Sequence, residues 1–123
     1  MTICLMKAIK NEVELQHTIK AHVKDGIAHT KFIYWLKQLV KKGISEQEDE
    51  LSASDKLVEF RREQGGFICP SFAPISGHAE NGAIVHYSSS KETSIPLRTG
   101  TFFLTDTGAH YEEGSTDITR TTA

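Results

Sequence analysis

The stretch that decides the fold lies between positions 101 and 120 and reads Thr101-Phe-Phe-Leu-Thr-Asp106-Thr-Gly108, Tyr111-Glu-Glu-Gly114 and Ser115-Thr-Asp117-Ile-Thr-Arg120. Two segments of strand-like composition flank the pair Glu112-Glu113, which predicts an antiparallel hairpin with a two-residue loop. That loop places Asp106 opposite Thr119, on the same sheet face as Asp117. One more residue in the loop would send the two carboxylates to opposite faces.

The two aspartates of this hairpin are candidate metal ligands. Asp106 and Asp117 would stand about 7–8 Å apart at the backbone, close enough for both carboxylates to reach one metal ion. Carboxylates are hard oxygen ligands that suit Mg²⁺, Mn²⁺ and similar ions, but two of them supply only part of a coordination shell. From spacing alone, a turn aspartate and an exposed strand aspartate remain the ordinary alternative.

The first half of the chain has helical periodicity. Apolar residues recur every four positions at Leu15, Ile19, Val23 and Ile27 and continue from Phe32, which predicts one long amphipathic helix over 11–42. Gly43 is a typical helix stop. The motif Ser45-Glu-Gln-Glu48 matches a capping box and predicts the start of a second helix, which ends at Gly65-Gly66.

Beyond Gly66 the composition changes to short apolar runs broken by glycine and proline, which predicts strands near 83–87, 101–106 and 114–120. Helices followed by a strand meander indicate an α+β fold. His86 follows the apolar run 83–85 and is expected to end a buried strand, where it would be a core or a site-lining histidine. His78 and His110 have turn-like neighbours, so we expect them to be solvated.

Composition excludes several classes of function. The chain has 123 residues, 38% of them hydrophobic and 24% charged, which predicts one globular domain over 1–123. A net charge of −2 argues against a nucleic-acid partner, and no apolar segment approaches the length of a membrane span. Cys4 and Cys69 form neither a disulfide framework nor a metal motif, and no signal peptide is evident, so we expect a cytoplasmic location.

Two longer segments of the second half are recognisable as motifs: Ser76-Gly-His-Ala-Glu-Asn-Gly-Ala-Ile-Val-His86-Tyr-Ser88 and Asp106-Thr-Gly-Ala-His-Tyr-Glu-Glu-Gly-Ser-Thr-Asp117-Ile-Thr-Arg-Thr121. They closely resemble the Xaa-Pro aminopeptidases (aminopeptidase P), of the creatinase or pita-bread class of metallopeptidases. The similarity extends to 10–15, 52–57 and 60–67 and so covers essentially the whole chain. The departures, at Thr107, His110, Glu80 and Ser89, are mild.

The resemblance implies a fold, a metal centre and an activity. It implies that Asp106 and Asp117 are the first two ligands of a dinuclear centre, usually of two Mn²⁺ ions, with Asp117 bridging them. It implies that His86 lines the substrate pocket near the scissile bond, in a catalytic or substrate-binding role. The family removes the N-terminal residue from peptides whose second residue is proline.

The resemblance also implies incompleteness, because the family site needs a histidine and two glutamates that would lie beyond Ala123. We therefore expect the N-terminal half of a pita-bread catalytic domain, inactive by itself, whose partner is a missing C-terminal half or a second copy in a homodimer. Two alternatives stay open: a non-catalytic module that dimerises or binds peptide, and a fragment of a prolidase or creatinase relative.

Overall fold

The long helix predicted over 11–42 is present as α2 (Glu12–Lys42) in the computed structural model, which describes residues 1–44 and 47–123. Asn11 caps it, because the Asn11 side chain accepts the N–H of Glu14 while the Glu14 carboxylate accepts the N–H of Asn11. Gly43 ends the helix with a φ of 81°, a left-handed value that glycine adopts at little cost. The predicted stop at Gly43 is therefore confirmed.

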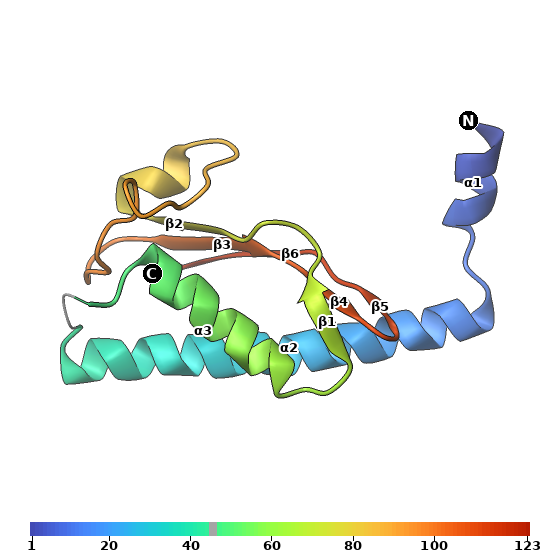
Figure 1. Ribbon diagram of the computed structural model, residues 1–123, viewed down its shortest axis with the longest axis horizontal. Coiled ribbons are helices and arrows are strands. Elements are labelled where there is room, and N and C mark those ends of the chain that lie inside the picture. Colours follow the sequence, from blue (N-terminus) through green and yellow to red (C-terminus); the bar gives the residue numbers. More distant parts are fainter. Residues whose placement is uncertain (45–46) are drawn as a thin grey trace.

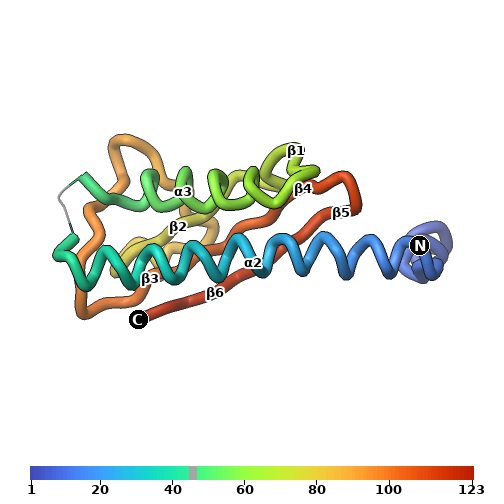
Figure 2. Tube along the Cα trace, turned by 90° about the horizontal axis from the view of Figure 1, so that it is seen from below, coloured from blue at the N-terminus to red at the C-terminus, as the bar shows by residue number. Residues whose placement is uncertain are grey.

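The apolar stripe of α2 is only partly buried. An amphipathic surface helix would turn such a stripe to the core, yet Leu15, Ile19, Val23 and Ile27 remain 45–57% exposed. The helix instead packs through a neighbouring face, which consists of Ala21, Asp25, Ala28, His29 and Phe32. Small alanines on that face let the strands approach closely, and Figure 2 shows the first turns of α2 extending past the sheets.

The described residues contain two further α-helices. A short helix, α1 (Thr2–Ala8), precedes α2 and is not predicted by the sequence pattern. The second predicted helix is α3 (Glu50–Arg62), which lies beside α2 and runs in the opposite direction (Figure 2). Its cap is Asp49, which forms a capping box with Ser52. The expected cap at Ser45 lies outside the described residues. No helix among those described has the length and apolar character of a membrane span.

In the part of the chain that the structure describes, the strands form two antiparallel three-stranded sheets (Figure 1). One has the order β1-β4-β5, with bounds Phe67–Pro70, Ala109–Tyr111 and Gly114–Ser115. The other has the order β2-β3-β6, with bounds Ile75–His78, Phe103–Thr107 and Ile118–Thr122. The chain changes sheet at Gly108, where a Cβ atom would stand only 2.1 Å from Ser71 Oγ and from the carbonyl oxygen of Thr116. Only glycine fits there.

The expected strand at 83–87 is wrong. This segment starts at the last residue of the 3₁₀ helix η1 (Ala79–Ala83) and continues as a turn. Its apolar residues Ile84 and Val85 are 54% and 82% exposed, so the hydrophobic run does not mark a buried strand. The strands predicted at 101–106 and 114–120 correspond to β3 and to β5 with β6, while β1 and β2 are missed by the sequence analysis.

The elements stack in layers, with α2 and α3 on one side of the sheets and η1 on the other (Figure 1). The larger core cluster lies between the helices and β3 and consists of Phe32, Ala53, Leu57, Leu97 and Phe103. A smaller cluster joins α2 to the β1-β4-β5 sheet through Ala21, Ala109 and Tyr111. The α+β class predicted from the order of elements is thus confirmed.

A buried ion pair links the two long helices. Arg61 of α3 donates to both carboxylate oxygens of Asp25 on α2, from Nε at 2.6 Å and from Nη2 at 3.1 Å, and both side chains are fully buried. Bidentate geometry of this kind is the strongest form of an arginine–carboxylate contact. It offsets the cost of removing two charges from water.

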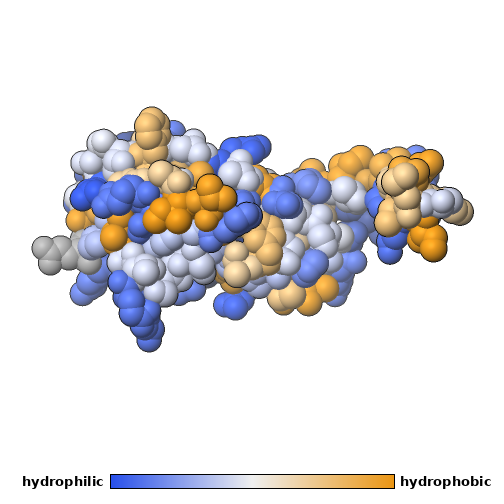
Figure 3. Space-filling model, turned by 90° about the horizontal axis from the view of Figure 1, so that it is seen from above, coloured by the Kyte–Doolittle hydropathy of each residue, from blue (hydrophilic) through white to orange (hydrophobic). Residues whose placement is uncertain are grey.

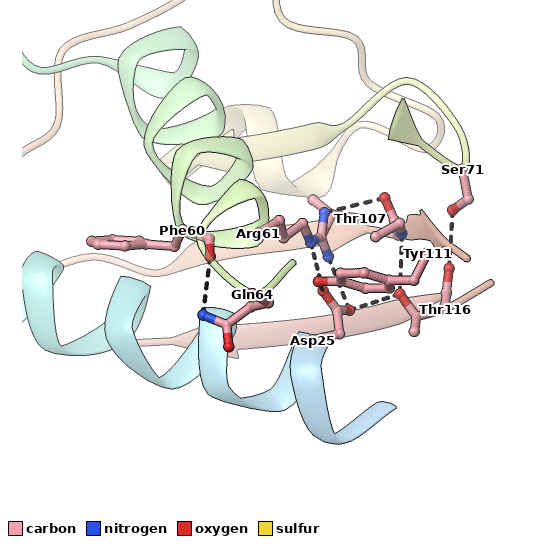
Figure 4. Close-up of polar contacts among 10 residues, drawn as sticks. Asp25, Phe60, Arg61, Gln64, Ser71, Thr107, Tyr111 and Thr116 are labelled. Atoms are coloured by element: carbon pink, nitrogen blue, oxygen red, sulfur yellow. Dashed lines mark hydrogen bonds and ion pairs between the residues drawn. The ribbon is translucent and has the colours of Figure 1, made fainter. Parts of the chain in front are cut away.

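The same ion pair binds the strands (Figure 4). Arg61 also donates to Thr107 Oγ1 at 3.0 Å and to the carbonyl oxygen of Gly108 at 3.2 Å. Asp25 accepts from Thr116 Oγ1 at 2.7 Å and from the hydroxyl of Tyr111 at 3.3 Å. Burial, together with the Asp25 charge, raises the pKa of Tyr111, so its hydroxyl stays protonated as a donor.

We predict that Asp25→Asn lowers the free energy of unfolding by about 3–5 kcal/mol, because it leaves the Arg61 charge buried without its counterion. Urea denaturation measures the change. Glu63→Gln is the matched control, since the Lys31–Glu63 pair also links α2 to the C-terminal end of α3, at its cap residue, but is 46% exposed at both side chains. The control should cost less than about 1 kcal/mol. Equal losses for both variants would contradict the prediction.

His29 gives a second prediction about stability. Both of its ring nitrogens are buried without a hydrogen-bond partner among the described residues, and burial, then Arg61, lowers its pKa. The unfolded chain therefore binds this proton more readily, so stability is full above about pH 6.5 and falls as the pH drops below it. We therefore predict that His29→Leu raises the free energy of unfolding relative to the parent at pH 5, and that this gain is larger at pH 5 than at pH 8.

Denaturant midpoints at the two pH values test this prediction. The control is His17→Leu on the same helix, where the side chain is exposed, and it should shift neither midpoint appreciably. A His29→Leu variant with the same pH dependence as the parent would refute the assignment.

Candidate metal and substrate site

Asp106 lies on β3, the central strand of its sheet, directly opposite Thr119 of β6. This register is the one that the two-residue loop predicts, and it is confirmed. Thr119 Oγ1 donates a hydrogen bond to Asp106 Oδ1 at 2.7 Å. The neighbours Thr105 and Thr107 are buried, and Thr107 contacts the Arg61 side chain of α3. Strand alternation therefore turns Asp106 to the face away from the helices.

Asp117 lies just before β6, in the connection from β5, and not within a strand as expected. It stands two residues from Thr119, the cross-strand partner of Asp106. Thr116 is buried and bonded to Asp25 on the helix side, whereas Asp117 is exposed. The two candidate ligands therefore belong to the same open side of the sheet, at its end nearest the β4–β5 hairpin.

The donor set fits a metal ion in part. Carboxylates are the right ligands for a hard divalent cation, and Asp106 and Asp117 offer two of them. Across residues 1–44 and 47–123, no three His, Cys, Asp or Glu side chains gather in a group that could hold a metal ion. Two carboxylates leave most positions of a six-coordinate shell to other donors.

His86 lies in an exposed turn that faces the same side of the sheet. The N–H of Tyr87 donates to the carbonyl oxygen of Ile84 at 3.2 Å, so residues 84–87 form a four-residue turn. His86 occupies its third position with a φ of 57°, where glycine or asparagine is usual. The expectation that His86 ends a buried strand is wrong, because this segment has no strand partner among the described residues.

The structure brings two of the three predicted site residues together. His86 and Asp106 line one hollow of about 310 Å³, whereas Asp117 is not among its lining residues. The hollow lies between the turn after η1 and the outer face of β2, β3 and β6, and it is otherwise lined by Ile75, Gly82, Ala83, Ile84, Val85, Leu104 and Thr119. It is mostly apolar, with one carboxylate, one imidazole and one hydroxyl, which is typical of ligand pockets.

Apolar surface surrounds this hollow. A second hollow shares Gly82, Ala83 and Leu104 with the first and is also lined by Phe102, which is 65% exposed. Figure 3 shows hydrophobic atoms gathered on this face of the molecule. The face opposite the helices therefore carries an exposed apolar patch beside the hollow, among hydrophilic and neutral residues.

One residue near the site differs from expectation, and another is not among those expected to take part. His78 is only 3% exposed, so its predicted solvation is wrong. Its Nε2 accepts the backbone N–H of Arg98 at 3.0 Å, and burial, followed by the Arg98 charge, lowers its pKa. The sequence analysis does not single out Thr119 as a functional residue, although a hydroxyl opposite a carboxylate in a predicted hairpin is a detectable signal.

Comparison with known proteins assigns the family. The model of metallopeptidase family M24 matches residues 16–123. The chain belongs to this family. An Xaa-Pro aminopeptidase of Drosophila melanogaster is 41% identical over 119 residues, and Xaa-Pro aminopeptidase 1 of Dictyostelium discoideum is 42% identical over 120 residues. Each alignment covers 97% of the M24 chain but only 19% of the relative, so the chain spans a small part of the curated relatives it matches.

Solved structures agree with this assignment. The X-prolyl aminopeptidase from Caenorhabditis elegans, described as a cytosolic enzyme with a di-nuclear active site, superposes with a TM-score of 0.87 at 32% identity. The alignment covers 95% of the M24 chain and 19% of that structure. Proline aminopeptidase P II from Yersinia pestis gives 0.74 at 27% identity, covering 94% and 24%. The predicted fold, one part of the pita-bread architecture, is confirmed.

The strained turn yields a prediction. Asparagine populates the left-handed region more readily than histidine, so His86→Asn should raise the free energy of unfolding by about 0.5–1 kcal/mol. Thermal denaturation measures the effect. Val85→Asn serves as the control, because Val85 is exposed in the same turn and has no positive φ. A destabilised His86→Asn protein would show that the imidazole makes a stabilising contact.

Proposed function

We propose that this M24 chain supplies Asp106 and Asp117 as two carboxylate ligands of a dinuclear metal centre in an Xaa-Pro aminopeptidase. The observation that carries the proposal is the hairpin register, which pairs Asp106 with Thr119, two residues along the chain from the exposed Asp117. The similarity to Xaa-Pro aminopeptidases, among them a structure described as having a di-nuclear active site, supports it.

His86 is the residue that we assign to the substrate. It lines the same hollow as Asp106, and the hollow is large enough for a small side chain or a proline ring. The proposed substrate is a peptide with proline at its second position. The proposed location is cytoplasmic, by similarity to the C. elegans enzyme, which is described as cytosolic. A bound metal pair, for which we propose Mn²⁺, would activate water and polarise the scissile carbonyl.

The chain's own residues would hold the metal-binding carboxylates in place and shape the hollow for the substrate. Thr119 fixes one rotamer of Asp106 by donating to Oδ1, which leaves Oδ2 free to face a ligand. Ile84 and Leu104 give one side of the hollow an apolar wall. The remaining ligands must come from other residues, so we propose that the 123-residue chain is catalytically incomplete by itself. A second copy of the chain is one candidate partner, and this homodimer stays a prediction.

Metal binding tests the proposal. Calorimetric titration of the purified chain with MnCl₂ should show weak binding, with a dissociation constant on the order of millimolar, because two carboxylates leave most of the shell to water. Asp106→Asn and Asp117→Asn should each abolish the heat signal. Asp55→Asn, an exposed carboxylate on α3, is the matched control and should leave it unchanged.

An Xaa-Pro dipeptide assay with added Mn²⁺ should stay at background for all four proteins. Sub-micromolar affinity, or turnover that Asp117→Asn abolishes, would show instead that the isolated chain assembles a full site. Metal binding that neither Asp106→Asn nor Asp117→Asn weakens would overturn the ligand assignment.

A further inference from the structure

A second buried carboxylate lies close to the candidate site but takes no part in it. Glu50 is the first residue of α3 and is fully buried. None of the Lys or Arg side chains in the described part of the chain forms an ion pair with it. A buried charge without a counterion is costly unless several hydrogen bonds satisfy it. The residues that donate those hydrogen bonds therefore indicate the structural role of Glu50.

The hydrogen bonds to Glu50 come from the segment that carries His86. Glu50 Oε1 accepts the backbone N–H of His78 at 2.7 Å, and Oε2 accepts the hydroxyl of Tyr87 at 2.6 Å. Asn81 Nδ2 donates to both oxygens, at 3.1 and 3.2 Å. His78 and Asn81 precede His86 in the chain, and Tyr87 follows it directly. One carboxylate therefore holds both ends of the segment 78–87.

The carboxylate itself is rigidly placed. The capping box between Asp49 and Ser52 fixes the first turn of α3. Asp49 also forms an isolated β-bridge with Pro96, and the N–H of Leu97 donates to the carbonyl oxygen of Glu48 at 2.8 Å. Glu50 therefore joins an exposed turn to a well-anchored helix end.

The segment that Glu50 holds is strained. Two non-glycine residues of the chain have positive φ among those described, Ala79 at 50° and His86 at 57°, and both lie within it. Such conformations persist when surrounding contacts over-determine them. Here the contacts that hold the turn are those of Tyr87, which is buried next to the exposed His86 and donates its hydroxyl to Glu50. Burial, and then the hydrogen bond to Glu50, raises the pKa of Tyr87, so its hydroxyl stays a donor.

We propose that Glu50 is a positioning residue, which holds the 84–87 turn in its left-handed conformation and so keeps His86 in the same hollow as Asp106. The importance of that position rests on the proposed function of His86. Glu50 itself touches neither substrate nor metal. Its carboxylate is needed because it accepts from three donors, whereas a glutamine amide would present an N–H₂ group to the N–H₂ group of Asn81.

NMR spectroscopy of the metal-free 123-residue chain tests this role. A residue with positive φ gives a strong NOE between its own amide and Hα protons, so this NOE at His86 reports the left-handed conformation directly. The amide exchange rate of Tyr87, whose N–H closes the turn, reports its local stability. The variants are Glu50→Gln and the milder Tyr87→Phe, and the control is Glu59→Gln, an exposed carboxylate of the same helix.

We expect both variants to weaken the His86 NOE and to accelerate Tyr87 exchange by about tenfold or more, with little change in α2 and β3. The Glu59→Gln control should match the parent. If Glu50→Gln does not fold, the Tyr87→Phe variant alone tests whether the Glu50–Tyr87 contact holds the turn. An unchanged NOE in the folded variants, or exchange that rises equally throughout the chain, would overturn the proposal. These readouts need neither metal nor substrate, so they remain separate from the tests of Asp106 and Asp117.

Discussion

The buried ion pair between Asp25 and Arg61 is the interaction on which the rest of this structure depends. It joins α2 to α3 and, through Thr107 and Thr116, joins both helices to the strands on either side of the hairpin. Each of these threonines is the immediate chain neighbour of a candidate metal ligand. The contacts on the helix side of the sheet therefore determine which side chains face outward, and a slip of one residue would unpair both threonines.

A second buried carboxylate acts on the other part of the site in the same way. Asp25 determines the orientation of the strands, and Glu50 binds the turn that presents His86. Both carboxylates lie on helices, which are the rigid elements of this fold, and both accept hydrogen bonds from segments far away in the sequence. The candidate site residues lie on the open face of the sheet. Their positions depend on contacts of Asp25 on the covered face and of Glu50 at the start of α3.

Local patterns in the sequence predict much of this arrangement, and long-range contacts explain what they miss. The Glu112-Glu113 loop determines the register of Asp106, and helical periodicity with Gly43 determines the length of α2, because both depend on neighbouring residues. The turn at His86 depends instead on Glu50, 36 positions earlier by residue number. No local signal reveals that partner, so the apolar run before His86 suggests a strand. The buried face of α2 is missed for the same reason.

The first turns of α2 have a consequence for the helix–coil equilibrium. Residues 12–20 are all exposed, so no tertiary packing holds them helical. They are helical because the packed turns beyond Ala21 provide a nucleus, from which each added residue costs little, and because the Asn11 box closes the free end. This part of α2 should therefore fray from Asn11 inward on warming while the rest of the fold persists. While it is helical, this segment is about 14 Å long and carries α1 away from the sheets.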